Sequence, residues 1–452
     1  MKELIEPQIL VTLESPRQVG KRKAYEHYKD SGIEWLGRIP EHWEARRLKY
    51  LTRLKYGDAL PSERREEGTI VVFGSNGPVG THSRANTTSP VIILGRKGSS
   101  GKIVFSEEAC FAIDTTYYID RMQKEVNIRW LFYILGLLGL DKVSEDSAIP
   151  GLSREYVHAQ QLPLPSLHEQ RAIIAFLDRE TANISELIAK KERLIELLQE
   201  RRTAIINQAV TKGLNPDVPM KDSGVEWLGE IPAHWEIVRL KYLAEEGLSN
   251  GLFKKKDMYG SGTKLVNVVD IYQNTYIVDI NRLNRVQANF SEIKTYQVNE
   301  GDIFFVRSSL KLEGVGASAC VKTVMEPILF ECHLVRMRPS ASRVDPLFLI
   351  NYLNACISRQ RLISLAYTTT MTTIGQDKMS SLEVILPPMI EQKAILAYID
   401  QETTKIDKLI SRIQEGIKKL KEYSTALISA AVTGKIDVRG EVADMSAEDA
   451  AI

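Results

Sequence analysis

An internal duplication is the feature that most limits how this chain can fold. Residues 29–51 read KDSGIEWLGRIPEHWEARRLKYL and residues 221–243 read KDSGVEWLGEIPAHWEIVRLKYL, with 18 of the 23 positions identical. Further along, PSLHEQRAIIAFLDRET at 165–181 is matched by PPMIEQKAILAYIDQET at 387–403. The period is far longer than the 20–50 residues of a solenoid repeat. The duplication predicts two domain-sized halves related by a pseudo-twofold axis; a tandem duplication without geometric purpose is the alternative.

The second motif of each half leads into a segment that predicts a long helix. Residues 168–212 contain neither Pro nor Gly and are rich in Ala, Glu, Lys, Arg, Leu and Ile. Gly213 and Gly434 follow the two segments, as expected for residues just beyond a helix end. A helix of about 45 residues would be roughly 65–70 Å long. One small domain cannot cover an apolar stripe of that length, so each helix needs a helical partner.

Apolar residues recur in both segments with the seven-residue spacing of a coiled coil. A pseudo-twofold relation between the halves would make the two helices antiparallel. The near-equal length of the two stripes favours pairing within one chain, and pairing between chains is the alternative. In either case the helices would act as a spacer of fixed length. The expected spacer residues are Leu177, Ile184, Leu187, Leu194, Leu198, Ile205, Ile399, Ile406, Leu409, Ile413, Leu420 and Leu427.

The segments between the duplicated motifs predict an α+β fold for each half. Short runs of Val, Ile, Phe and Tyr bounded by Gly, Asn and Ser are typical of strands, as in 69–80 and 301–321. Each body then contains an apolar helical stretch, at 129–140 and 346–357. The predicted architecture is therefore two globular α+β domains separated by an antiparallel coiled coil of two long helices.

Composition excludes several classes of protein. The chain has 452 residues, 44% of them apolar, and no run of about 18 apolar residues that could span a membrane. The N-terminus lacks the apolar core of a signal peptide. Four cysteines in a chain of this length cannot form a disulfide scaffold, which indicates a reducing compartment. The net charge of +1 means that any surface for nucleic acid must be local.

Several expected loops combine basic, hydroxyl and amide side chains, which suit contacts to phosphates and base edges. A solvated loop with no ligand is the alternative reading for any single residue. The candidate DNA-binding residues are Ser75, Asn76, Arg96, Lys97, Ser99, Ser100, Lys102, Asn250, Lys254, Lys255, Arg307, Ser308, Ser309, Lys311 and Thr370.

Motifs for catalysis, cofactors and metals fail on spacing. GRKGSSGK at 95–102 has five residues between its outer glycines, and Ile103 follows the lysine, so it does not match a phosphate-binding P-loop. The seven histidines show no metal-ligand spacing, and Cys332–His333 stands alone. His42 and His234 lie in the duplicated I-P-x-H-W motif, which we interpret as a packing element. We therefore expect no catalytic residue, no metal site and no cofactor bound by this chain.

Two motifs, each present twice, identify a resemblance. D-S-G-x-E-W-L-G-x-I-P-x-H-W-E occurs at 30–44 and 222–236, and L-P-x-P…E-Q at 162–170 is paired with L-P-P…E-Q at 386–392. This arrangement resembles the specificity subunit of type I restriction–modification systems, over nearly the whole chain. The resemblance implies a non-catalytic cytoplasmic protein of a prokaryote, in which two target-recognition domains read a split, asymmetric site in double-stranded DNA.

The resemblance also implies partners and a domain order. Two methyltransferase subunits would dock on the helices and domain flanks, and restriction–translocation subunits would join them, with S-adenosylmethionine, ATP and Mg²⁺ bound by these partners. The expected segments are an N-terminal extension (1–27), a first target-recognition domain (28–165), a first spacer helix (166–213), a linker (214–219), a second target-recognition domain (220–388), a second spacer helix (389–435) and an acidic, disordered tail (436–452).

Two other functions stay open at this point. A protein-interaction scaffold of a related complex would bind DNA only weakly, and an enzyme with an unrecognised site would show turnover as an isolated chain.

Overall fold

The computed structural model describes residues 22–122, 126–142, 151–273, 275–368 and 371–441. The chain forms two compact units, one of Met1–Glu192 with Gln414–Ile452 and the other of Arg193–Ile413. Both boundaries fall inside the long helices, so each unit contains part of each helix. We call them unit 1 and unit 2 and describe each by itself. None of the helices that the structure describes is long and apolar enough to cross a membrane.

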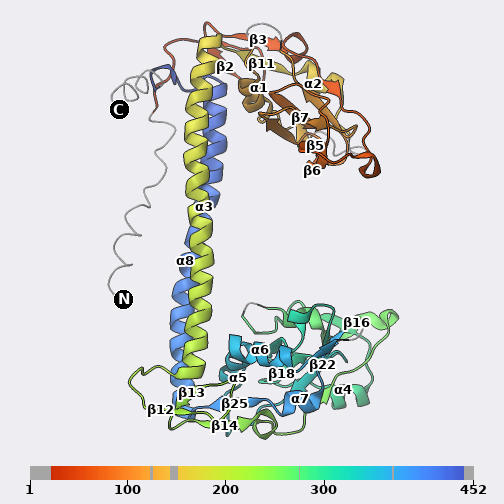
Figure 1. Cartoon of the computed structure of the whole chain (residues 1–452), viewed down its shortest axis with the longest axis vertical. Coiled ribbons are helices and arrows are strands. Elements are labelled where there is room, and N and C mark those ends of the chain that lie inside the picture. The colour runs from red at the N-terminus through yellow and green to blue at the C-terminus, as the bar shows by residue number, and fades with distance from the viewer. Residues whose placement is uncertain (1–21, 123–125, 143–150, 274, 369–370, 442–452) are drawn as a thin grey trace. The chain divides into compact units, whose positions relative to one another are not determined.

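Unit 1 contains a four-stranded sheet of order β4-β10-β7-β8 and a three-stranded sheet of order β6-β5-β9 (Figure 1). β5 and β9 are parallel, and the other neighbours are antiparallel. Two short pairs, β1-β2 and β11-β3, complete the unit. The strands are β1 Tyr28–Asp30, β2 Arg38–Pro40, β3 Glu44–Arg47, β4 Lys55–Tyr56, β5 Ile70–Gly74, β6 Gly77–His82, β7 Val91–Gly95, β8 Ile103–Ser106, β9 Phe111–Ala112, β10 Thr116–Ile119 and β11 Gln161–Leu164.

Unit 2 repeats this topology strand for strand. Its four-stranded sheet has the order β15-β22-β18-β20, and its three-stranded sheet, β17-β16-β21, again pairs two strands in parallel. The pairs β12-β13 and β14-β25 match the two short pairs of unit 1, while β19-β24-β23 is an addition. The strands are β12 Met220–Asp222, β13 Glu230–Pro232, β14 Glu236–Arg239, β15 Ser249–Asn250, β16 Tyr259–Val266, β17 Asn284–Val286, β18 Ile303–Val306, β19 Ser308–Ser309, β20 Ser318–Cys320, β21 Ile328–Phe330, β22 Leu334–Met337, β23 Tyr367–Thr368, β24 Thr372–Thr373 and β25 Glu383–Leu386.

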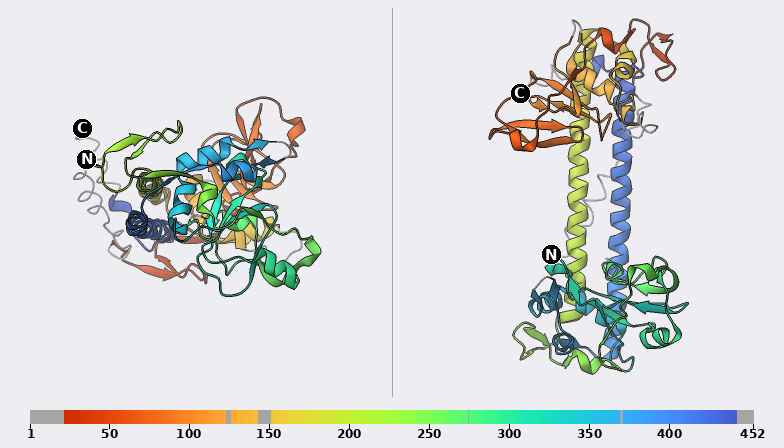
Figure 2. Two further views of the ribbon diagram at one scale, coloured as in Figure 1. Left: turned by 90° about the horizontal axis from the view of Figure 1, so that it is seen from below. Right: turned by 90° about the vertical axis from the view of Figure 1, so that its right-hand side faces the viewer.

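Two long helices, α3 (Leu167–Lys212) and α8 (Met389–Val432), confirm the predicted helix pair. The larger sheets of each unit lie to one side of the long helices, as Figure 1 shows for β5 and β7 in unit 1 and for β16, β18 and β22 in unit 2; Figure 2 gives two further views. The shorter helices are α1 Ile128–Leu135, α2 Arg154–Ala159, α4 Phe290–Tyr296, α5 Pro346–Asn354, α6 Cys356–Ser364 and α7 Gln376–Ser380.

The contacts inside each unit make the helix pair antiparallel. In unit 1 the first turns of α3, with Phe176 and Leu177, share a core with Leu427 near the end of α8. In unit 2 the last turns of α3, with Val210, share a core with Ile395 near the start of α8. The beginning of one helix thus packs against the end of the other, as the sequence predicted.

Burial of the expected spacer residues differs between the two helices. In α8 the column is continuous, and Ile399, Ile406, Ile413, Leu420 and Leu427 are all buried. In α3, Leu177 and Ile184 are buried, whereas Leu194, Leu198 and Ile205 are only half-buried. Near the end of α3 the buried residues are instead Ile206, Ala209 and Val210. Leu187 and Leu409 differ from the expectation, because their side chains are exposed. A straight helix drifts against a strict seven-residue repeat, which explains why the buried face moves along α3.

The glycine that follows each long helix packs against a tryptophan of the duplicated opening motif. Gly213 and Gly434 both have a positive φ, +77° and +72°. A Cβ on Gly434 would lie 2.4 Å from Pro40 Cδ and 3.0 Å from Trp43 Cζ3, and one on Gly213 would lie 3.1 Å from Trp235 Cζ2. Glycine is therefore required twice over, for the left-handed backbone and for the close approach of the ring.

The ends of the described chain differ from the expected boundaries. Tyr25 lies in the core of unit 1, although residues 1–27 were expected to be an extension. Ile436 and Val438 are also buried there, although residues 436–452 were expected to be a disordered tail. Arg22 joins the two segments by ion pairs to Glu180 and Glu441. Tyr25 packs edge-on against Trp43, with ring centres 5.8 Å apart. The remainder of the tail, 442–452, lies outside the described residues.

Candidate nucleic-acid interface

A buried glutamine fixes the body of each unit to its long helix. In unit 1, Gln170 Oε1 accepts a hydrogen bond from the Asn127 N–H at 2.7 Å, and its Nε2 donates to the Pro165 carbonyl at 2.9 Å. In unit 2, Gln392 makes the matching bonds to the Asp345 N–H (2.8 Å) and the Pro387 carbonyl (2.9 Å). Asn127 and Asp345 cap α1 and α5 in turn. The duplicated E-Q therefore orients each body on its helix.

The neighbouring glutamate ties the second motif to the opening motif. Glu169 accepts from His42 Nε2 at 2.8 Å and from Trp43 Nε1 at 3.2 Å. Glu391 accepts from His234 Nε2 at 2.7 Å and from Trp235 Nε1 at 2.9 Å. Both histidines thus belong to a structural junction, which agrees with the interpretation of the I-P-x-H-W motif as a packing element.

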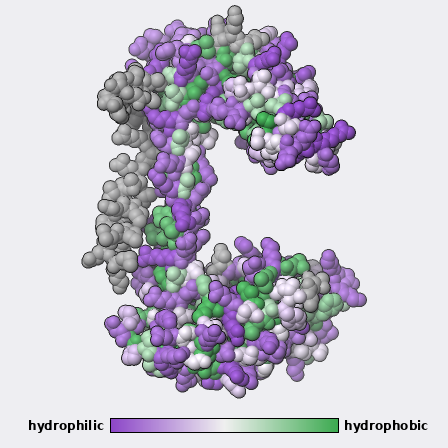
Figure 3. All heavy atoms as spheres, in the orientation of Figure 1, coloured by the Kyte–Doolittle hydropathy of each residue, from purple (hydrophilic) through white to green (hydrophobic). Residues whose placement is uncertain are grey.

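In unit 1 the structure brings the predicted DNA-binding residues of two loops together. The turn between β5 and β6 carries Ser75 and Asn76, and Lys102 at the end of the β7–β8 loop donates to the Asn76 carbonyl (2.7 Å) and Oδ1 (3.0 Å). Lys97 and Ser99 on the same loop are exposed, whereas Ser100 is buried. The visible surface of this part of unit 1 mixes hydrophilic and hydrophobic side chains (Figure 3), and the exposed ones include Val71 on β5 and Val79 on β6. The two loops, one from each of the larger sheets of unit 1, are thus joined through Lys102 and Asn76.

Arg96 belongs to an arginine–tyrosine cluster that sequence reasoning missed. Its guanidinium lies 5.2 Å from the centre of the Tyr56 ring, and that of Arg154 lies 5.1 Å from the same centre. Arg96 also donates to the Asp114 carbonyl through Nε (3.2 Å) and NH2 (2.8 Å). Tyr56 is 46% exposed, so its ring is accessible beside two positive charges. Arg154 begins α2 and is far from Tyr56 and Arg96 in the sequence, so no local pattern predicts that they meet.

Tyr117 packs against this arginine–tyrosine cluster. Burial, with a smaller contribution from Tyr56, raises the pKa of Tyr117 to about 12. The Tyr117 hydroxyl donates to the Leu152 carbonyl at 3.0 Å. Tyr117 packs edge-on against Tyr56, with ring centres 5.1 Å apart.

In unit 2 the predicted residues gather where β18 ends. Ser308 and Ser309 form β19, and Ser308 Oγ lies 3.2 Å from Thr373 Oγ1 on β24. Ser309 is buried, Arg307 and Ser308 are half-buried, and Lys311 is exposed. Asn250 accepts a hydrogen bond from Gln376 Nε2 at 2.8 Å. Thr370 lies outside the described residues.

Lys254 and Lys255, adjacent candidates, have different environments. Lys254 pairs with Glu292 at 2.8 Å, and its side chain is only 7% exposed. The hydrogen bond from Lys254 lowers the pKa of the Glu292 carboxyl. Lys254 is thus engaged within the unit, while Lys255 is exposed to solvent.

Arg96 and Arg307 occupy equivalent positions in the two units. The Arg96 N–H donates to the Thr115 carbonyl at 2.9 Å, and the Arg307 N–H donates to the His333 carbonyl at 2.8 Å. The Arg96 carbonyl accepts from the Leu152 N–H (2.9 Å), and that of Arg307 from the Ile374 N–H (3.0 Å). One backbone frame therefore presents an arginine in both units, surrounded by loops of different sequence.

Comparisons with known proteins match both halves of the chain to one family. The model of the family described as type I restriction modification DNA specificity domain matches residues 40–197 and 232–419. The MjaVIII type I restriction enzyme specificity subunit of Methanocaldococcus jannaschii is 23% identical over 432 residues, which cover 91% of this chain and 97% of that protein. The EcoBI specificity subunit of Escherichia coli is 23% identical over 356 residues, covering 76% and 73%.

A solved structure has the same fold. It is described as the structural basis of complex assembly and conformational transition of the type I R-M system, and its chain aligns with a TM-score of 0.64 and 16% identity. The alignment covers 88% of this chain and 99% of that chain.

Proposed function

Because this chain belongs to the family of type I restriction–modification DNA specificity subunits, we propose that it selects the DNA sequence on which such a complex acts. Each unit would read one half of a bipartite, asymmetric site in double-stranded DNA. The helix pair α3–α8 would set the length of the unread gap between the half-sites.

One observation carries this proposal. The two units share the four-stranded sheet, the three-stranded sheet, both short strand pairs and both helix junctions, yet the loops around Arg96 and Arg307 differ in sequence and partners. Loops on a constant scaffold are where binding specificity is usually varied. Arginine, lysine, serine and asparagine side chains are those that contact phosphates and base edges in the major groove. Two units that share a scaffold but differ in their loops fit a DNA site whose two halves differ in sequence.

We place catalysis and its cofactors on other subunits. In this proposal two methyltransferase subunits bring S-adenosylmethionine, and restriction–translocation subunits bring ATP and Mg²⁺, in the cytoplasm of a prokaryote. A duplicated exposed pair supports binding of two copies of one partner. Lys49 lies 4.8 Å from the centre of the Tyr50 ring and Lys241 lies 4.9 Å from that of Tyr242. Both tyrosines are more than half exposed, so core packing does not explain why the motif keeps them in both halves.

A loop-body exchange tests the proposal. Residues 52–160 are replaced by the corresponding segment of another family member, and the DNA methylation pattern is sequenced in cells that carry the full system. We expect one half of the methylated site to change and the other half and the gap to stay the same. The reciprocal exchange of the body of unit 2 is the matched control and should change only the other half. A change in both halves, or in neither, would contradict independent reading.

A further inference from the structure

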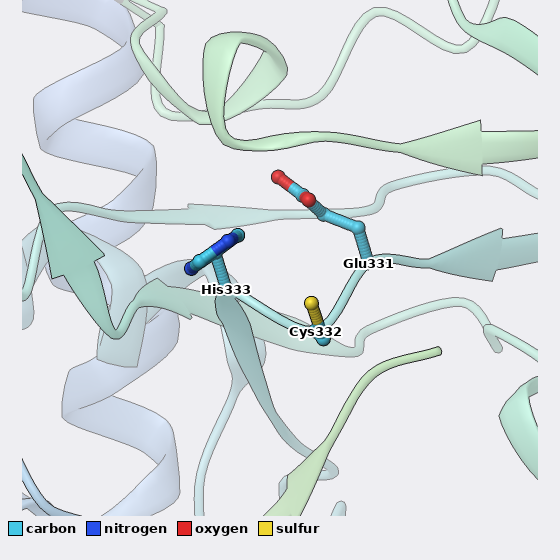
Figure 4. Close-up of side chains that lie close together, drawn as sticks. All are labelled: Glu331, Cys332 and His333. Carbon is cyan, nitrogen blue, oxygen red and sulfur yellow. The ribbon is translucent and has the colours of Figure 1, made fainter. Parts of the chain in front are cut away.

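Three potential metal ligands lie on one turn of unit 2. Glu331, Cys332 and His333 join β21 to β22, and one ligand atom from each lies within 4.8 Å of those of the other two. Figure 4 shows the carboxylate, the thiol and the imidazole facing a common space. The histidine spacing in the sequence predicted no metal site, but on this geometry we propose that the turn binds one transition-metal ion, with Zn²⁺ as the best match.

The backbone around the turn holds the ligands in place. The Leu334 N–H donates to the Glu331 carbonyl at 3.1 Å, which closes the turn. The Val268 N–H donates to Glu331 Oε1 at 2.9 Å, so the carboxylate is oriented while its second oxygen stays available. A hydrogen bond of this kind to a ligating carboxylate is typical of metal sites. Glu331 and Cys332 are half-buried and His333 is exposed, which leaves a path for an ion.

The donor set selects the class of metal. A thiolate and an imidazole favour Zn²⁺ and similar ions over Mg²⁺ and Ca²⁺, which prefer oxygen ligands. Zinc binds sulfur at about 2.3 Å and nitrogen or oxygen at about 2.0–2.2 Å. Ligand atoms in a tetrahedral site are therefore roughly 3.5 Å apart, and small side-chain rotations would bring the three atoms to that spacing. Three protein ligands leave a fourth position open for water.

Unit 1 provides an internal comparison. Its equivalent turn consists of Ile113, Asp114 and Thr115, because the Ile113 N–H bonds to the neighbouring parallel strand (3.0 Å) just as the Glu331 N–H does (3.1 Å). Only one of these three side chains is a metal ligand of the kind found in unit 2. The site is thus specific to unit 2, and the family scaffold alone does not require it.

The site adjoins a predicted reading residue. The His333 carbonyl accepts the N–H of Arg307, so a bound ion would hold the turn that supports this arginine. This consequence rests on the proposed function, but the metal site itself does not.

Cobalt spectroscopy on the full-length chain tests the site without DNA. The protein is stripped with a chelator, kept reduced with a phosphine, and titrated with Co²⁺. We expect one Co²⁺ per chain and the near-ultraviolet absorption of a thiolate–cobalt bond, which Zn²⁺ then abolishes by displacement. Cys332→Ser should lose this absorption and His333→Asn should weaken binding at least tenfold. Cys356→Ser is the matched control, because Cys356 is exposed on another element, and it should bind like the wild type.

Absence of the absorption in the wild-type chain, or its persistence in Cys332→Ser, would overturn the proposal. Far-ultraviolet circular dichroism of each variant shows that a lost signal comes from a folded chain. Since the readout involves no DNA, failure of the metal site and failure of the proposed function remain distinguishable.

Discussion

At the scale of single residues, the two glutamates of the repeated junction differ in burial. The Glu169 side chain is 5% exposed, while that of Glu391 is 39% exposed. Glu169 also accepts from Ser166 through its N–H and Oγ. We expect Glu169→Gln to lower the free energy of unfolding by about 1–3 kcal/mol, because the amide places a donor against these donors. Glu391→Gln is the matched control and should cost less than about 1 kcal/mol, since solvent screens its charge. Equal costs in denaturant titrations would contradict this account.

The same glutamate predicts a dependence on pH. Burial alone would raise the pKa of Glu169, but hydrogen bonds from His42, Trp43 and Ser166 outweigh it and lower the pKa below its ordinary value of 4.5. A carboxyl with a lowered pKa in the folded state stabilises the fold above the ordinary value, and this contribution is lost as pH falls through the lowered one. The stability difference between wild type and Glu169→Gln should therefore shrink below about pH 4.5.

We expect different roles for the adjacent residues Lys254 and Lys255. Lys254 would stabilise the fold, and Lys255 would contact DNA. We expect Lys255→Ala to reduce the slope of DNA affinity against salt concentration by about one, because one phosphate contact is lost. Lys254→Ala should leave that slope unchanged and lower thermal stability, since it removes the cation that pairs with Glu292. Fluorescence anisotropy of the assembled complex on its DNA, measured at several salt concentrations, distinguishes them. A reduced slope for Lys254→Ala would show that this lysine also reaches the backbone.

At the scale of elements, helices were easier to predict than loops. The absence of Pro and Gly and the following glycines located α3 and α8, because these signals are local. The exposed Leu187 and Leu409 show the limit of this reasoning, since a fixed seven-residue count cannot follow the drift of a helix face. The pairing of Tyr56 with Arg96 and Arg154 depends on three separate segments, and no local pattern contains it. The ion pair between Lys254 and Glu292 also joins segments that are far apart in the sequence, so no local pattern predicts it.

The helix pair predicts how the gap can be changed. Four residues inserted after Glu192 in α3, together with four after Ile413 in α8, would lengthen the pair by about 6 Å. At 3.4 Å per base pair, we expect the gap in the methylated sequence to grow by about two base pairs with both half-sites unchanged. The control inserts four residues into the linker 214–219 and should leave the gap as it was. A gap that stays constant in the helix variant would refute the spacer role.

At the scale of the whole molecule, the duplication predicted that one plan is used twice, and both units confirm it. The sequence could not show that unit 1 is built from both ends of the described chain. The Asp437 N–H donates to the Lys23 carbonyl at 2.7 Å, and Tyr28 donates to the Gly434 carbonyl at 3.0 Å. In unit 2 the same place is spanned by the linker after Gly213, and the Ala233 N–H bonds to Pro219 as the Glu41 N–H bonds to His27. Such distant contacts carry no local signature in a sequence.

Because of this correspondence, the chain has the connectivity of a closed ring that is cut at one of two equivalent positions. One position lies between residues 441 and 22, and the other lies within 214–219. A rearranged protein that begins and ends within 214–219, with residue 441 joined to residue 22 by a short flexible tether, should fold with an unchanged circular dichroism spectrum and direct methylation to the same sequence. Opening the chain inside β18 instead breaks a central strand and should abolish folding. If the protein opened within 214–219 also fails to fold, the covalent link through 214–219 is required, and the contacts between Lys23 and Asp437 cannot substitute for it. If it folds, either position can serve as the place where the polypeptide starts.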